Sequence, residues 1–90
     1  IFEGTVRIDG KFHGEIHTDD IVIIGETADV NAEINAGEII ISGNVKGNIF
    51  ARDSLEVLAP GKVYGNILTP KLMIQEGVVF EGTCRMGKPD

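Results

Sequence analysis

The sequence predicts an all-β fold, a single-domain parallel β-solenoid of about five to six short coils. Two observations lead to this prediction. One pattern of apolar residues and glycines recurs five times and covers nearly all 90 residues. Within each copy the apolar residues alternate with period two, and no window shows helical spacing for more than a turn. Repeats this short are typical of stacked solenoids, in which each coil buries its apolar side against its neighbours.

The repeat is most regular at residues 6–16 and 39–49. Both segments read apolar, x, apolar, x, Gly, x, apolar, x, Gly, x, apolar. The copies at 21–34, 55–67 and 72–84 follow the same template with short insertions. Their strand residues are mainly Ile, Val, Leu and Phe, which suit a pleated and buried surface.

Alignment of the copies places their apolar residues in four columns, which we expect to face inward. The members are Val6, Ile21, Ile39, Leu55 and Leu72 in the first column; Ile8, Ile23, Ile41, Val57 and Ile74 in the second; Phe12, Val30, Val45, Val63 and Phe80 in the third; and Ile16, Ile34, Ile49, Ile67 and Cys84 in the fourth. The steps within a column are mostly 15 to 18 residues. A coil of that length fits a three-sided cross-section, with sides of about five or six residues.

A glycine column accompanies the apolar columns and contains Gly14, Gly47, Gly65 and Gly82, with Ala32 in the remaining copy. By alternation these residues face inward, where a narrow and bent interior leaves no room for larger side chains. We therefore interpret them as structural core glycines. The insertions, at 25–29, 58–62 and 75–79, all fall between the second and third columns, so one corner of the coil accommodates the changes in length.

Charge and motifs argue against several functional classes. The net charge is −6 and no basic stripe is present, which disfavours nucleic acid as a partner. Gly61-Lys62 lacks the upstream glycine of a phosphate-binding loop, so we expect no nucleotide and no other cofactor.

Catalytic and metal-binding candidates are few. His13 and His17 lie near Glu15, Asp19 and Asp20, but on an extended strand the two histidines are about 13 Å apart. We interpret them as solvated and expect no metal site. Cys84 falls in the inward fourth column, where a thiol acts as a small hydrophobic group. We expect no enzymatic activity; a β-helix acyltransferase is a remote alternative that would need a catalytic His and a trimer.

The two ends of the repeat carry no polar capping segment. Phe2 and Val6 lead into the first copy, and Phe80, Cys84 and Met86 close the last one. An uncapped coil exposes unpaired backbone groups and an apolar cross-section, both of which another molecule's end can satisfy. We expect these five residues to form an interface for self-assembly. Segments outside the 90 residues that cover the ends are the alternative.

The sequence resembles the bactofilins. The likeness rests on Ile41-Ser42-Gly43-Asn44-Val45-Lys46-Gly47-Asn48-Ile49, on Val63-Tyr64-Gly65-Asn66-Ile67 and on the closing Val79-Phe80-Glu81-Gly82-Thr83-Cys84. The resemblance implies a right-handed, three-sided β-helix in a bacterial cytoskeletal protein that polymerises without nucleotide through like ends. It also implies a place at the cytoplasmic face of the membrane, in cell shape or local wall synthesis. Phe80 matches the aromatic residue of the last coil that supports polymerisation in the family.

We therefore expect residues 1–86 to form a polymerisation core and residues 87–90 to begin a disordered C-terminal tail. The chain itself is the expected partner. Membrane contact through an N-terminal tail and binding of wall enzymes are further expectations. The alternative function is a lateral scaffold or adaptor for a wall enzyme or membrane protein, with Leu58 and Tyr64 as candidate contacts near the insertion corner.

Overall fold

The computed structural model describes residues 4–87, in which the chain forms strands and no helix. Eight strands make one sheet, and every pair of neighbours is parallel. This confirms the predicted all-β, parallel architecture. The strands are β1 (Val6–Ile8), β2 (Lys11–His17), β3 (Ile21–Ile24), β4 (Asp29–Ile41), β5 (Asn44–Val57), β6 (Lys62–Thr69), β7 (Leu72–Ile74) and β8 (Val79–Met86).

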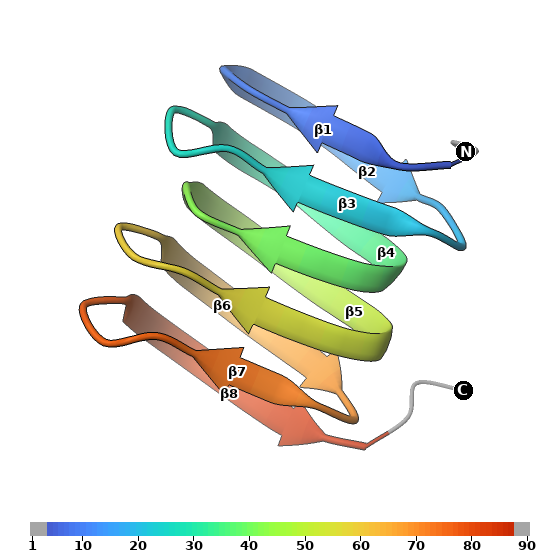
Figure 1. The fold of residues 1–90 in the computed structure, drawn as a ribbon, viewed down its shortest axis with the longest axis vertical. Coiled ribbons are helices and arrows are strands. Elements are labelled where there is room, and N and C mark those ends of the chain that lie inside the picture. The colour runs from blue at the N-terminus through green and yellow to red at the C-terminus, as the bar shows by residue number, and fades with distance from the viewer. Residues whose placement is uncertain (1–3, 88–90) are drawn as a thin grey trace.

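The chain winds through five coils that stack along one axis (Figure 1). The first coil consists of β1 and β2, and the fifth consists of β7 and β8. β4 and β5 are longer because each continues through a corner and so belongs to two successive coils. Near strands run to the left and far strands to the right as the coils descend in Figure 1, which makes the solenoid right-handed.

Each coil has three sides, which we call the first, second and third faces. The first face contains β1, β3, the ends of β4 and β5, and β7. The second and third faces share the remaining strands and are separated by a bend at the glycine column. Loops at 25–28, 58–61 and 75–78 connect the first face to the second. The insertions therefore fall at one corner, as the sequence predicts.

Stacked Ile and Val side chains form the core between the three faces. Residues of the third column lie in register, as do those of the fourth: Phe12, Val30, Val45, Val63 and Phe80 in one, and Ile16, Ile34, Ile49, Ile67 and Cys84 in the other. The central members of both columns are fully buried. Branched side chains suit this arrangement because their few rotamers pack well against identical neighbours on a pleated surface.

The predicted members of the first and second columns are wrong in the second coil. The sequence predicts that Ile21 and Ile23 face inward, whereas the structure buries Val22 and Ile24 completely and leaves Ile21 and Ile23 half-buried. Val22 pairs with Val6 and with Ile39, so it belongs to the first column. All four residues of β3 are apolar, so period-two alternation gives no basis for choosing between them. A shift of one residue exchanges the two sides of a strand, and pairing with the neighbouring coils decides it here.

The glycine column marks the bend between the second and third faces. Gly14, Gly47, Gly65 and Gly82 have φ between +127° and +135°, a conformation that side chains disfavour. A Cβ at Gly65 would also overlap the carbonyl oxygen of Gly47, its partner in the preceding coil. The backbone of the preceding coil therefore leaves no space for a side chain at Gly65.

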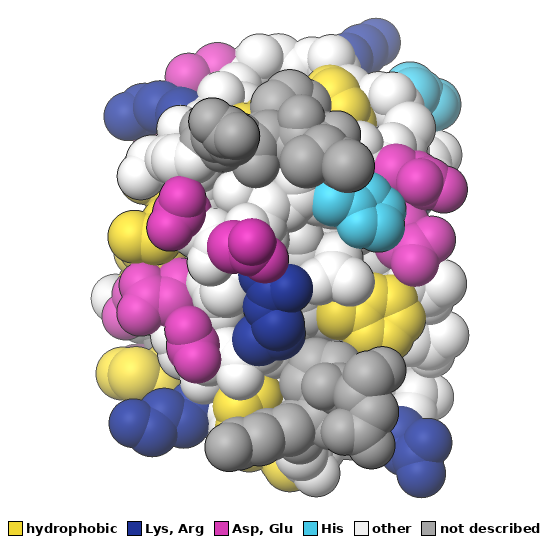
Figure 2. Space-filling model, turned by 90° about the vertical axis from the view of Figure 1, so that its right-hand side faces the viewer, with side chains coloured by type: hydrophobic (Ala, Val, Ile, Leu, Met, Phe, Trp, Pro, Cys, Tyr) yellow, Lys and Arg dark blue, Asp and Glu magenta, His cyan; other side chains and the backbone are white. Residues whose placement is uncertain are grey.

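At the corner between the third and first faces, one side chain reaches across two coils to the start of the second coil. Arg52 Nη2 donates to the carbonyl oxygen of Thr18 at 2.8 Å and lies 2.8 Å from Asp19 Oδ1. Figure 2 looks onto this corner and shows acidic side chains gathered around a basic one. The buried hydroxyl of Thr69, one coil further on, donates to the carbonyl oxygen of Lys71 at 2.7 Å. Arg52 thus links two coils, whereas the Thr69 hydroxyl stabilises the turn within its own corner.

Candidate functional site

The two ends of the solenoid leave strand edges without a neighbour. Within residues 4–87, β7 pairs only with β5 and β8 only with β6. At the other end, and again among the described residues alone, β1 pairs only with β3 and β2 only with β4. The outer edge of each terminal strand therefore presents backbone N–H and C=O groups that can pair with another strand.

The fifth coil exposes apolar side chains that the preceding coils bury. Val57 is 0% exposed, whereas Ile74, the next member of its column, is 45% exposed. Leu72, Phe80 and Cys84 contact the core but are only partly buried, although their partners in the fourth coil are buried. The difference arises because residues 4–87 form no sixth coil that covers them. The last coil therefore presents an apolar cross-section.

Phe80, Cys84 and Met86 are the predicted interface residues at this end, and all three lie on β8. Phe80 and Cys84 face inward on either side of Gly82. Met86, at the end of the strand, is 59% exposed. The structure thus brings these three predicted residues together at one edge.

The N-terminal end is more closed in its described part. Val6 is half-buried, while Ile8 and Ile16 of the same coil are buried. The Gly4 N–H donates to Asp20 Oδ2 at 3.0 Å, and the Gly4 carbonyl accepts from the Thr18 hydroxyl at 3.3 Å. Phe2, the other residue predicted for this end, lies outside the described residues.

Three exposed apolar residues of the C-terminal coil are absent from the predicted interface. Met73, Ile74 and Val79 are 64%, 45% and 40% exposed. Ile74 belongs to a predicted inward column. Its position in the last copy of the repeat was the sequence feature that could have identified it as an exposed interface residue. Met73 points outward from β7, and the sequence pattern does not distinguish it from other outward residues.

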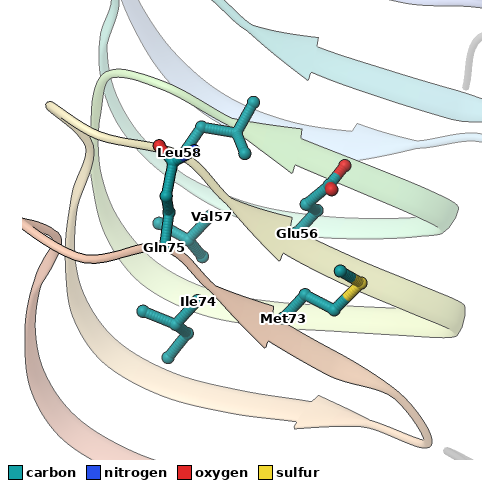
Figure 3. A pocket seen from close by; sticks show the side chains of 6 residues that line it. All are labelled: Glu56, Val57, Leu58, Met73, Ile74 and Gln75. Carbon is teal, nitrogen blue, oxygen red and sulfur yellow. The ribbon is translucent and has the colours of Figure 1, made fainter.

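The predicted lateral residues do not share one site. Leu58 lies in a shallow hollow at the loop corner, shown in Figure 3, whose lining residues are Glu56, Val57, Leu58, Met73, Ile74 and Gln75. Tyr64 lies on the second face, with the Lys46 ammonium 6.0 Å from the centroid of its ring. Leu58, at the loop corner, and Met73, on the first face, thus border one apolar hollow.

The histidines form no metal-binding group with other side chains in residues 4–87. His17 Nε2 lies 3.4 Å from Glu15 Oε2, and His13 is exposed. Cys84 is a free thiol.

The fold and its ends agree with one protein family. A family model described as "Bactofilin: Polymer-forming cytoskeletal" matches residues 1–85, nearly the whole chain. The chain belongs to the bactofilin family. Bactofilins are a polymer-forming cytoskeletal family, so membership points to self-association, to which an apolar, unpaired end is suited. Comparison with curated proteins found no match, and neither did comparison with solved structures.

The described residues contain no helix long and apolar enough to cross a membrane.

Proposed function

We propose that this bactofilin chain assembles end to end into filaments and needs no nucleotide to do so. The observation that supports this most directly is the change in burial along the second column, from a fully buried Val57 to an Ile74 that is 45% exposed. Docking of a second end restores the missing burial, and full burial of such a side chain contributes roughly 1.5–3 kcal/mol. It also supplies hydrogen-bond partners to the edges of β7 and β8.

Joining through like ends gives a specific pairing at the C-terminal coil. A two-fold axis at Gly82 makes β8 antiparallel to β8 of the partner, so that Phe80 meets Cys84 of the partner subunit. The same axis passes near Met73, so Leu72 meets Ile74 of the partner subunit. A large aromatic residue then faces a small thiol, and two aliphatic residues face each other. These contacts make the interface self-complementary.

In this proposal residues 1–86 are the polymerisation core, and Phe2, Val6, Phe80, Cys84 and Met86 are its interface residues. Family membership further suggests a scaffold for cell shape or wall synthesis at the cytoplasmic face of the bacterial membrane. Wall enzymes would then be partners, and an N-terminal tail would contact the membrane.

The test is negative-stain electron microscopy of the purified chain without nucleotide, beside Phe80→Arg and Met86→Arg. We expect filaments from the parent chain and short, folded species from both variants, because a charge then lies in the apolar interface. Met86 is largely exposed, so its replacement leaves the fold intact. Circular dichroism checks the fold of each variant.

Phe50→Arg is the matched control. Phe50 is half-buried and points outward from the middle of β5, away from both ends. Filaments should persist in this variant. A parent chain that stays monomeric at high concentration, or interface variants that still form filaments, would refute end-to-end assembly.

A further inference from the structure

We propose that the first face binds the first face of a second copy, with the two solenoids side by side and antiparallel. This contact differs from the end-to-end one and joins filaments laterally. The lateral contact rests on the proposed function in one respect, because end-to-end filaments are what repeat the contact many times.

The proposal begins with one outward column that runs along the middle of the first face. The pairing register places Arg7, Ile23, Ile40, Glu56 and Met73 next to one another in successive coils. Arg7 is exposed, and the next three residues are half-buried. Ile23 and Ile40 thus form the apolar centre of this surface. The positive charge of Arg7 lies on one side of them, and the negative charge of Glu56 lies on the other.

This order of charges is self-complementary in one arrangement. When a second solenoid lies antiparallel, with its third coil opposite the second coil of the first, Arg7 faces Glu56 of the partner subunit. Ile23 then faces Ile40 of the partner subunit, and the two-fold axis repeats both contacts. All four residues find a suitable partner, which supports specificity as well as attraction.

Other arrangements fit less well. In a parallel pair Arg7 faces Arg7 of the partner subunit and Glu56 faces Glu56 of the partner subunit, which is repulsive. A shift of one coil in the antiparallel pair sets Glu56 against Ile23 of the partner subunit in one direction, and Arg7 against Ile40 of the partner subunit in the other. A charged group then loses water without gaining a partner, which is unfavourable.

The third face is the nearest competitor among the described residues. Phe50 and Leu68 form an outward apolar pair there. In the antiparallel arrangement that stacks them, the flanking residues are Asn35 and Arg85, which give no pair of opposite charges. The first face is therefore the better self-binding surface.

Arg7 keeps its internal partner in this arrangement. Its Nε lies 3.1 Å from Asp9 Oδ2, and both side chains are well exposed. A guanidinium has five N–H donors, so Arg7 can hold Asp9 and a second carboxylate together.

The contact is small. Four coils spaced by about 4.8 Å and five residues spaced by about 3.3 Å give roughly 300 Å² on each partner. That is well under the roughly 1,000 Å² in total that a stable pair of proteins needs. Single subunits should therefore pair weakly, and repetition along two filaments should make the association stable.

Charge reversal tests the contact by filament width in negative-stain images. We expect paired filaments from the parent chain, single filaments from Arg7→Glu and from Glu56→Arg, and paired filaments again from the double variant. Lys46→Glu is the matched control, because Lys46 is exposed on the second face. Filaments that are always single, or pairs that survive both reversals, overturn the proposal while leaving end-to-end assembly intact.

Zero-length coupling tests the arrangement without relying on filaments. In Arg7→Lys a carbodiimide should link the introduced amine to Glu56 of another copy, detected by mass spectrometry of mixed ¹⁴N and ¹⁵N chains. Within one chain these two positions are three coils apart, about 14 Å, too far for such a link. Coupling of the introduced amine to Asp9 of the same chain serves as the internal positive control. Absence of the link between copies at high concentration, with the internal link present, overturns the proposal even if no filaments form.

Discussion

Gly14 and Gly65 show separately the two reasons why a position in the glycine column requires glycine: a positive φ, and the close approach of the preceding coil. Gly14 and Gly65 share nearly the same φ, +127° and +129°. A Cβ at Gly14 would lie 4.0 Å from the nearest atom, the Phe12 ring, whereas a Cβ at Gly65 would overlap the Gly47 carbonyl. Gly14 therefore carries only the cost of its backbone conformation, and Gly65 also carries the close approach of the preceding coil.

We expect Gly14→Ala to lower the free energy of unfolding by about 1 kcal/mol, from backbone strain alone. Gly65→Ala should lower it by about 3 kcal/mol or more, because stacked backbones must also move apart. Urea denaturation at a concentration where the chain is unassembled measures both. Equal losses in the two variants would show that stacking adds no constraint.

At the scale of the element, β3 shows how pairing sets the orientation of a strand. Its four residues are all apolar, yet the structure buries Val22 and Ile24 and leaves Ile21 and Ile23 half-buried. Pairing of Ile24 with Ile8 and Ile41 continues the second column without interruption. The outward isoleucine Ile23 becomes available to the first face as a result.

Neighbouring isoleucines of β3 should therefore differ sharply in their effect on stability. Ile24→Ala removes a fully buried side chain and should lower the free energy of unfolding by about 3 kcal/mol, within the usual 2–5 kcal/mol for such a truncation. Ile23→Ala should lower it by less than about 1 kcal/mol, since this side chain already contacts water. Urea denaturation of the two variants is the measurement. The reverse order would favour the orientation that alignment of the copies predicts, with Ile21 and Ile23 facing inward.

At the scale of the whole molecule, end-to-end and lateral contacts depend differently on charge. The chain has a net charge of −6, and its second coil carries Asp19, Asp20, Glu26, Asp29 and Glu33 without a basic residue. Repulsion between such chains opposes any assembly, while the ends attract through apolar groups. The lateral contact in contrast uses an attraction between Arg7 and Glu56.

Added salt should therefore have opposite effects on the two contacts. Raising the ionic strength from about 0.05 M to about 0.5 M shortens the screening length, so mutual repulsion and the lateral ion pairs both weaken. We expect the amount of sedimenting filament to rise or hold while paired filaments separate into single ones. Sedimentation and electron microscopy of the same samples check this. A steady fall in sedimenting polymer would contradict apolar contact as the main force between ends.

The sequence by itself determined the architecture. The five copies, the third and fourth columns and the insertion corner are all evident from periodicity, and the structure confirms them. Local alternation sufficed there because polar or glycine residues separate the apolar positions and leave a single inward set. The resemblance to bactofilins, which the family match confirms, also follows from these residues.

Only the tertiary structure decided which residues lie next to one another across coils. It selected Val22 and Ile24 over their neighbours, because a uniformly apolar strand carries no signal of its orientation. It also aligned Arg7, Ile23, Ile40 and Glu56, which are 16 or 17 residues apart, in one column. The lengths of the connecting segments at the corners differ and determine that alignment. The spacing of apolar residues along the chain therefore does not predict which outward residues become neighbours. The exposure of Met73 likewise has no signal in the sequence, because the pattern does not distinguish it from other outward residues.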